Sequence, residues 1–177
     1  MNVILIGYRG TGKTSVGQKL AARFQRRFVD ADECLEARAG RSISEIFATQ
    51  GEPAFRDLES QVVSEILAGD ELVVSLGGGA VLRAPNRQAM ARSGTTFWLR
   101  ASAGTIAERL RNDPLTARRR PALTSSGGDK EIVDLLEERR PLYEQCADHT
   151  ICTDHKSLDT IVDEIVCLLE HPRRASS

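Results

Sequence analysis

The feature that most constrains this chain is a glycine-rich segment near its start. The segment reads GYRGTGKT at residues 7–14 and directly follows the apolar run VILI at residues 3–6. It matches the pattern G-x-x-x-x-G-K-[ST], in which a tight loop follows a buried strand and opens a helix. The glycines let successive backbone N–H groups turn toward phosphate oxygens, and the N-terminus of the following helix favours the same anion. We therefore expect a nucleoside triphosphate to bind at the end of the first strand.

Two side chains of this loop have predicted roles in holding the phosphates. Lys13 is expected to reach the β- and γ-phosphates, and the Thr14 hydroxyl is expected to bind Mg²⁺. The predicted nucleotide-binding residues of the loop are Gly10, Thr11, Gly12, Lys13, Thr14 and Ser15. The loop alone leaves open whether the phosphate is hydrolysed, used as a switch or transferred to another molecule.

The rest of the chain alternates between strand-like and helix-like segments. Short apolar runs predict strands at residues 3–6, 27–30, 72–76, 96–99 and 150–153. Helical spacing of apolar residues predicts helices between and after these strands, with Ser42, Ser102 and Ser157 as capping residues. This alternation predicts an α/β protein with three layers, α/β/α, around a five-stranded parallel sheet. Ligands of such a sheet collect at the carboxyl ends of its strands.

Two local expectations follow from proline and from a pair of acids. The helix over residues 132–140 is expected to end before Pro141, because proline lacks a backbone donor and clashes with the preceding turn. Asp30 and Asp32 are expected on an extended segment, where side chains two residues apart face the same way. One carboxylate could then organise Mg²⁺ and the other could hold an acceptor hydroxyl. Taken in isolation, the pair could equally be a solvated acidic turn.

Residues 112–130 form a long polar stretch with little periodicity, and they include three consecutive arginines at 118–120. Such a stretch inside a compact domain is typical of a lid, and we expect it to be mobile. Closure of a lid over a phosphoryl-transfer site excludes water and can bring an arginine to the transferring group. We expect a single domain over residues 1–170 and a flexible tail over residues 171–177.

The overall charge and hydropathy pattern narrows the class of protein. Lys and Arg number 24 and Asp and Glu number 25, so the formal net charge of −1 argues against general binding of nucleic acid. No apolar run approaches the ~18 residues that a membrane-spanning helix needs, and no charged-then-apolar leader precedes the first strand. We therefore expect a cytoplasmic protein with no membrane partner. The sequence does not give the oligomeric state, and our working expectation is a monomer.

Motifs of other nucleotide-binding classes are missing from the sequence. No Asp is followed three residues later by Gly, and the dipeptide Asn-Lys does not occur, so a GTPase switch and its base-reading motif are absent. An ATPase motor would place an acid at the end of an apolar strand to hold the Mg²⁺ shell, yet the strand at 72–76 carries Ser75 there. The available acids are Asp30 and Asp32.

Two isolated arginines and a glycine triplet complete the inventory. Arg56 lies in the stretch FRDLE, Arg139 precedes RPLY, and residues 77–79 are Gly-Gly-Gly after the third strand. Either arginine alone is most often a surface charge, but a guanidinium is also the natural bidentate partner for a carboxylate. Together with the phosphate loop and the paired acids, this inventory favours a kinase for a small hydroxylated acid.

The motifs resemble those of the shikimate kinase family, in the order of that family and over roughly residues 2–169. The segments that carry the resemblance are GYRGTGKT, Asp30-Ala31-Asp32, FRDLE at 55–59, GGGAV at 77–81, RPAL at 120–123 and RRPLY at 139–143. The resemblance implies a nucleoside-monophosphate-kinase-like fold. It also implies ATP-dependent phosphorylation of the 3-hydroxyl of shikimate, giving shikimate 3-phosphate and ADP on the route to chorismate and aromatic amino acids, with Mg²⁺ as the cofactor.

The resemblance also implies a role for each matching residue. Lys13 and Thr14 would bind nucleotide phosphate and Mg²⁺, with Asp30 supporting the metal through water. Asp32 would hold the shikimate hydroxyls and accept a proton. Arg56 and Arg139 would bind the carboxylate of shikimate, and Gly78 would add a backbone contact. Arg120, chosen over Arg119 because Pro121 follows it, would reach the transferring phosphate from the lid. The loop containing Lys156 would lie against adenine.

Two other hypotheses remain open on the sequence alone. A kinase for another small acid, such as gluconate, would share the phosphate loop and an acidic substrate, although FRDLE and the glycine triplet count against it. A nucleotide-sensing module without chemistry would bind ATP tightly and show no substrate-dependent turnover. An ADP-release assay with shikimate and gluconate in parallel distinguishes all three.

Overall fold

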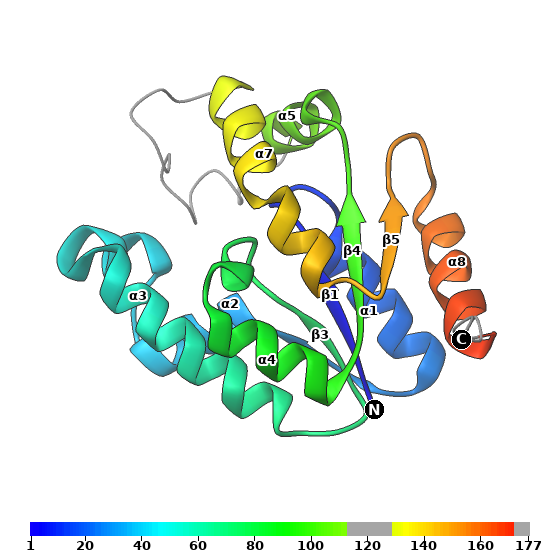
Figure 1. Ribbon diagram of the computed structural model, residues 1–177, viewed down its shortest axis with the longest axis horizontal. Helices are drawn as coiled ribbons and strands as arrows, with labels where there is room; N and C mark the ends of the chain where they lie inside the picture. Colours follow the sequence, from blue (N-terminus) through cyan, green and yellow to red (C-terminus); the bar gives the residue numbers. More distant parts are fainter. Residues whose placement is uncertain (113–128, 172–177) are drawn as a thin grey trace.

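The computed structural model describes residues 1–112 and 129–171 of the chain. In these residues five strands form one parallel sheet in the order β2-β3-β1-β4-β5 (Figure 1). The strands are β1 (Asn2–Ile6), β2 (Arg27–Asp30), β3 (Leu72–Ser75), β4 (Gly94–Arg100) and β5 (His149–Cys152). The predicted five-stranded parallel sheet is therefore confirmed.

Helices cover both faces of this sheet, and the sequence of β1 shows why. Val3 and Leu5 pack with one layer, formed by α1 (Lys13–Phe24) and α8 (Leu158–Glu170). Ile4 and Ile6 point the opposite way, into a layer that contains α3 (Ile43–Leu67), α4 (Ala84–Ser93) and α7 (Asp129–Cys146) (Figure 1). Because β1 is buried on both faces, its run of apolar residues is uninterrupted. This is the expected three-layer architecture.

The strand order brings three functional segments to one edge of the sheet. β1 pairs with β3, and β3 pairs with β2, so their carboxyl ends are neighbours. The phosphate loop follows β1, the glycine triplet and the short 3₁₀ helix η1 (Ala80–Leu82) follow β3, and Asp30 ends β2. Three segments that are distant in the sequence therefore meet where ligands of parallel sheets bind.

The extended arrangement expected for Asp30 and Asp32 is wrong. Asp30 is the N-cap of a helix missed from the sequence, α2 (Ala31–Ala39), and its Oδ1 accepts a hydrogen bond from the Asp32 backbone N–H at 3.0 Å. An N-cap aspartate satisfies a free donor of the first turn, and acids in that turn interact well with the helix dipole. Asp32 therefore projects from the first turn of a helix, and the two side chains are not parallel neighbours on a strand.

The expected end of the last-but-one helix before Pro141 is also wrong. α7 continues through Pro141 to Cys146. The residues just beyond the proline are strongly held: Tyr143 is fully buried and stacks on Trp98 with 5.4 Å between ring centroids. The free energy of this packing outweighs the local cost of a proline in the helix interior.

The helix over residues 43–67 begins at the expected capping residue, Ser42. Ser42 and Glu45 form the expected capping box, in which the Ser42 hydroxyl accepts from the Glu45 N–H and the Glu45 carboxylate accepts from the Ser42 N–H. Gly51 (φ 77°) then interrupts the helical geometry, so the segment is two helices that meet at a kink. The second of these carries Arg56.

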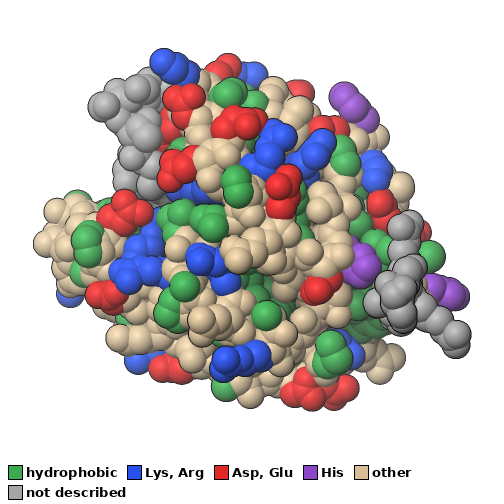
Figure 2. Space-filling view, in the orientation of Figure 1, with side chains coloured by type: hydrophobic (Ala, Val, Ile, Leu, Met, Phe, Trp, Pro, Cys, Tyr) green, Lys and Arg blue, Asp and Glu red, His purple; other side chains and the backbone are tan. Residues whose placement is uncertain are grey.

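Some predictions fall on the chain between the described ranges or after them. Asn112 belongs to the end of α5 (Ala103–Asn112), and Asp129 and Lys130 belong to the first turn of α7. The remainder of the predicted lid, including Arg118–Arg120, lies outside the described residues, as do residues 172–177 of the predicted tail. Within the described part of the chain, no helix is both long enough and apolar enough to cross a membrane. Figure 2 shows cationic and anionic side chains interspersed over the face in view.

Candidate functional site

The phosphate loop has a backbone that only glycine adopts readily. Gly7, Gly10 and Gly12 have φ values of 141°, 79° and 93°, in the region where other residues are strained. A Cβ atom on Gly7 would also lie 2.3 Å from the carbonyl oxygen of Leu99 on β4. Gly12 is the N-cap of α1 and offers no side chain to the first turn, which contains no acid. The helix N-terminus is thus arranged to favour an anion.

Side chains of the loop also brace its backbone. Lys13 Nζ donates to the carbonyl oxygens of Gly7 and Tyr8 at 2.8 and 2.9 Å. The buried Thr11 hydroxyl donates to the Tyr8 carbonyl oxygen at 2.8 Å. Thr14 and Ser15 lie in the first turn of α1 with exposed side chains. All six predicted nucleotide-binding residues of the loop therefore stand together at the carboxyl end of β1.

The acidic residues after β2 lie next to the phosphate loop. The Thr14 hydroxyl donates to Asp30 Oδ2 at 3.2 Å, while Asp30 Oδ1 is held by the Asp32 N–H. Asp32 is half-buried in the first turn of α2. A hydroxyl and a carboxylate oxygen brought together in this way suit Mg²⁺, which takes oxygen ligands and keeps several waters.

Arg56 is a buried side chain held by two carboxylates. Only 7% of it is exposed. Its Nη1 donates to Glu59 Oε2 at 2.7 Å, and its Nε and Nη2 donate to Glu52 Oε1 at 3.1 and 3.0 Å. A Cβ on Gly79 would lie 2.4 Å from both Nη atoms and 2.7 Å from Cζ, so the terminal edge of the guanidinium faces the glycine triplet. The FRDLE segment and the glycine triplet are therefore in direct contact, through Arg56 and Gly79.

Arg139 lies on α7, the helix that contacts the same triplet through Tyr143. The Tyr143 hydroxyl donates to the Gly78 carbonyl oxygen at 2.6 Å, and Arg139 lies one helical turn earlier on the same buried face. Only 5% of Arg139 is exposed, and its buried Nε has no hydrogen-bond partner in the described residues. An unsatisfied buried donor of a cation is costly, which is typical of a group reserved for a ligand.

One residue of the site has no signal in the sequence. Arg109 on α5 donates to the Gly10 carbonyl oxygen at 3.2 Å and to the hydroxyl and carbonyl oxygens of Thr153 at 3.0 and 2.8 Å. It therefore ties the phosphate loop to the loop after β5. From the sequence, Arg109 is one of several charges on an amphipathic helix. The predicted nucleotide contact in that second loop, Lys156, pairs with Glu164 of α8 at 2.5 Å.

The loop after β5 is further fixed by a carboxylate. Both oxygens of Asp154 accept from the Ser102 N–H at 3.0 Å. Burial acts to raise the pKa of Asp154, but hydrogen bonds from Thr105, Ser102 and Cys152 outweigh it and hold that pKa below its ordinary value. Asp154 therefore stays ionised and keeps this loop joined to the start of α5.

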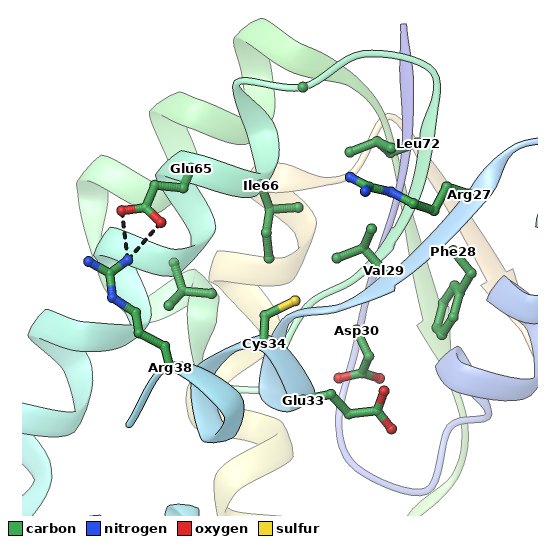
Figure 3. Close-up of a pocket in the computed structure, with 12 residues that line it drawn as sticks. Arg27, Phe28, Val29, Asp30, Glu33, Cys34, Arg38, Glu65, Ile66 and Leu72 are labelled. Atoms are coloured by element: carbon green, nitrogen blue, oxygen red, sulfur yellow. Dashed lines mark hydrogen bonds and ion pairs between the residues drawn. The ribbon is translucent and has the colours of Figure 1, made fainter. Parts of the chain in front are cut away.

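A separate hollow of about 760 Å³ opens behind Asp30, between β2, α2 and α3 (Figure 3). Its apolar lining includes Val29 and Ile66, and the Arg38–Glu65 ion pair, at 2.6 Å, lies at one side. Burial, with help from Asp30 and Glu33, raises the pKa of the Cys34 thiol in its wall. This hollow shares Asp30 with the phosphate-loop site but none of the site's arginines.

Comparison with known proteins gives a consistent result. A family model described as shikimate kinase matches residues 9–170. A shikimate kinase from Symbiobacterium thermophilum is 46% identical over 166 residues, covering 94% of this chain and 94% of the relative. One from Rhodopirellula baltica is 39% identical over 165 residues, covering 93% and 88%.

Solved structures agree in fold over nearly the whole chain. A shikimate kinase from Acinetobacter baumannii in complex with shikimate matches with a TM-score of 0.90 at 33% identity, covering 98% of this chain and 95% of that one. A gluconokinase from Sinorhizobium meliloti matches with a TM-score of 0.61 at 20% identity, covering 96% and 91%. The second likeness concerns the fold alone.

Proposed function

The chain belongs to the shikimate kinase family, and we propose from this premise that it transfers the γ-phosphoryl group of ATP to the 3-hydroxyl of shikimate. The bond between the γ-phosphorus and the bridging oxygen of ADP breaks, and a bond between that phosphorus and the acceptor oxygen forms. The hydroxyl proton leaves to Asp32 or to solvent. The products are shikimate 3-phosphate and ADP.

The observation that carries the proposal is a pair of buried arginines, one facing the glycine triplet and one on the helix that contacts it. Arg56 faces Gly79, and Arg139 lies one turn from the Tyr143 hydroxyl that bonds Gly78. Two guanidiniums that are 7% and 5% exposed suit one carboxylate on a small acceptor. The phosphate loop lies beside them, because a Cβ on Gly78 would be 3.2 Å from the Gly7 carbonyl oxygen.

We assign the remaining roles by chemistry. Lys13 binds the β- and γ-phosphates, and α1 directs its N-terminus at them. Asp32 orients the acceptor hydroxyl first and accepts its proton second, because the hydroxyl proton leaves late in a loose transition state. Arg120, outside the described residues, remains the predicted cation on the transferring group.

Thr14 and Asp30 are the residues that fit Mg²⁺, since their oxygens already stand 3.2 Å apart beside the phosphate loop. Thr14 would bind the ion directly and Asp30 through water. Bound Mg²⁺ would neutralise charge on the β- and γ-phosphate oxygens. We propose further that the protein works as a monomer, because the described groups assigned to donor and acceptor all belong to one chain. Light scattering of the purified protein tests this last point.

An ADP-release assay tests the proposed activity. We expect MgATP-dependent turnover with shikimate, and little with gluconate or with the methyl ester of shikimate. The ester keeps every hydroxyl but removes the carboxylate charge that the arginines would grip. Equal turnover with gluconate would overturn the substrate assignment. Tight ATP binding with no turnover on any acid would favour a nucleotide-sensing module.

Gly79→Ala is expected to raise the KM for shikimate about tenfold or more, equivalent to at least about 1.4 kcal/mol, with little change in the KM for ATP. The new methyl group would lie 2.4 Å from both Nη atoms of Arg56, and that guanidinium has to leave its position between Glu52 and Glu59. Steady-state kinetics with each substrate varied in turn measure the effect.

The matched control for this change is Gly104→Ala. A Cβ on Gly104 in α5 meets nothing within 4 Å, so the variant should keep both KM values. It should also be slightly more stable, because alanine favours a helix over glycine. Unchanged shikimate kinetics in Gly79→Ala would show that the terminal edge of Arg56 does not meet the substrate.

A further inference from the structure

One face of α7 carries a row of buried residues spaced four apart: Glu131, Leu135, Arg139 and Tyr143. This spacing places them one above another on the helix. Tyr143 anchors the C-terminal end of the row to the acceptor side, through its hydrogen bond to the Gly78 carbonyl oxygen. Arg139, the proposed carboxylate ligand, stands in the middle of the row. The contacts that fix the N-terminal end of α7 therefore affect the position of Arg139.

The phosphate loop holds that N-terminal end. Arg9, in the middle of GYRGTGKT, forms an ion pair with Glu131, with 3.5 Å between Nη2 and Oε1. The side chains are 18% and 1% exposed. The neighbouring Tyr8 is 1% exposed and packs in a cluster with Ile132 and Leu135 of α7. The arginine of the loop is thus directed at α7, and two kinds of contact join the loop to the helix.

We propose that Arg9 and Glu131 are positioning residues that couple the nucleotide loop to the acceptor subsite through α7. The expected effect on the KM for shikimate rests on the proposed function. Neither residue belongs to the set assigned to shikimate or ATP. Their effect is exerted on Arg139, which the Arg9–Glu131 pair and the Tyr143–Gly78 hydrogen bond hold from the two ends of one rigid helix.

The Glu131 carboxylate is buried and the Arg9 side chain is only partly exposed, which explains why the pair should matter. Exposed ion pairs contribute little, because water screens them and the side chains lose entropy. Removing one partner of a pair that is largely shielded from water takes an opposite charge away from the group that remains, and the structure around it rearranges. The first turn of α7 is where this rearrangement begins, and Arg139 lies two turns further along the same face.

The chain contains a matched control on the same helix. Arg140 pairs with Glu137 at 2.6 Å, and these side chains are 49% and 62% exposed. The variant Arg140→Met removes a cation of the same kind from α7, next to Arg139 in sequence, without touching the phosphate loop. It should leave kinetics and nucleotide response unchanged.

The kinetic test compares Arg9→Met, Glu131→Gln, the double variant and Arg140→Met. We expect each single change at the pair to raise the KM for shikimate about tenfold, with a clearly smaller change in the KM for ATP. The double variant should be no worse than the poorer single variant, because each single change already removes the ion pair between Arg9 and Glu131. Arg9→Lys keeps the charge and should recover part of the loss. Additive effects, or a rise confined to the KM for ATP, would overturn the coupling.

A second test does not depend on turnover. Trp98 is the only tryptophan of the chain and stacks on Tyr143, so its fluorescence reports on the row of α7. A non-hydrolysable ATP analogue with Mg²⁺ should change this emission in the natural protein and in Arg140→Met. In Arg9→Met and Glu131→Gln the change should be lost, with calorimetry showing that the analogue still binds.

The two tests separate the possible failures. If the natural protein does not turn over shikimate but the emission change behaves as expected, the proposed substrate is wrong and the coupling stands. If shikimate is turned over but the natural protein shows no emission change, or the change survives in both pair variants, the coupling through α7 is wrong. A fall in thermal stability with unaltered KM values and an unaltered emission response would show that the pair is only structural. That result would also overturn the proposed coupling.

Discussion

A protein carrying Asp32→Asn is expected to lose turnover by about 10²–10⁴-fold, the range associated with a group that takes part in proton transfer, while ATP still binds. Asparagine keeps the size of the side chain and its place in the first turn of α2. It removes the negative charge and one acceptor, so the hydroxyl is neither oriented nor relieved of its proton. Single-turnover kinetics give the loss in rate, and calorimetry with MgATP gives the affinity.

Glu33→Gln is the control for Asp32→Asn. Glu33 follows Asp32 in the same turn of α2, but it is exposed and lines the hollow behind Asp30. The control removes an equal charge from the same turn, so it should retain near-normal turnover. Near-normal turnover in Asp32→Asn would contradict the assigned role. An equal loss in both variants would show that the net charge of the helix start, and not the Asp32 side chain, is what matters.

Arg139→Met is expected to raise the KM for shikimate by roughly 10²-fold, which corresponds to about 3 kcal/mol for losing one partner of a buried charge-assisted hydrogen bond. The stability of the free protein should not fall with it. Arg139 is 5% exposed and its Nε has no hydrogen-bond partner in the described residues, so the cation is costly until a ligand satisfies it. Thermal unfolding without ligand, together with steady-state kinetics, measures both effects.

A combined result would show that Arg139 is held ready for an anion. Adding shikimate should raise the unfolding temperature of the natural protein and should do so much less in the variant, because only the natural protein binds tightly at that concentration. Loss of stability with an unchanged KM would instead make Arg139 a structural cation. Arg140→Met again serves as the neighbouring control, since its partner Glu137 is exposed.

The features predicted best from the sequence are those set by local rules. The phosphate loop needs glycine at positions with positive φ, and a strand buried on both faces needs an unbroken apolar run. Capping residues such as Ser42 and Ser157 mark helix starts without reference to the rest of the fold. These signals were sufficient for the three-layer architecture, and the family followed from the phosphate loop together with FRDLE, the glycine triplet and the other quoted motifs; both predictions are confirmed.

The features that were missed or wrong depend on tertiary contacts. Nothing local to RRPLY shows that Tyr143 stacks on Trp98 and so carries α7 past Pro141. The helix that begins at Ala31 is only weakly amphipathic, so its pattern gives little signal, and the Asp30 cap was interpreted as part of an acidic pair. Arg109 and the Arg9–Glu131 pair join segments far apart in the sequence, which no spacing rule can connect.

The strand order places most of the groups assigned to the acceptor on one side of β1 and a support of the phosphate loop on the other. Of the groups assigned to the acceptor, Asp32, Arg56 and Gly78 lie in the segments that follow β2 and β3, and Arg139 lies on α7. The Arg109 link to the phosphate loop comes from the side of β4 and β5. The stretch between β2 and α4 could therefore be exchanged to bind a different acid, while the phosphate loop and its Arg109 link stay unchanged. The element that limits this freedom is α7, which touches the phosphate loop with Glu131 and the glycine triplet with Tyr143. A change of substrate would have to be compatible with both ends of that one helix.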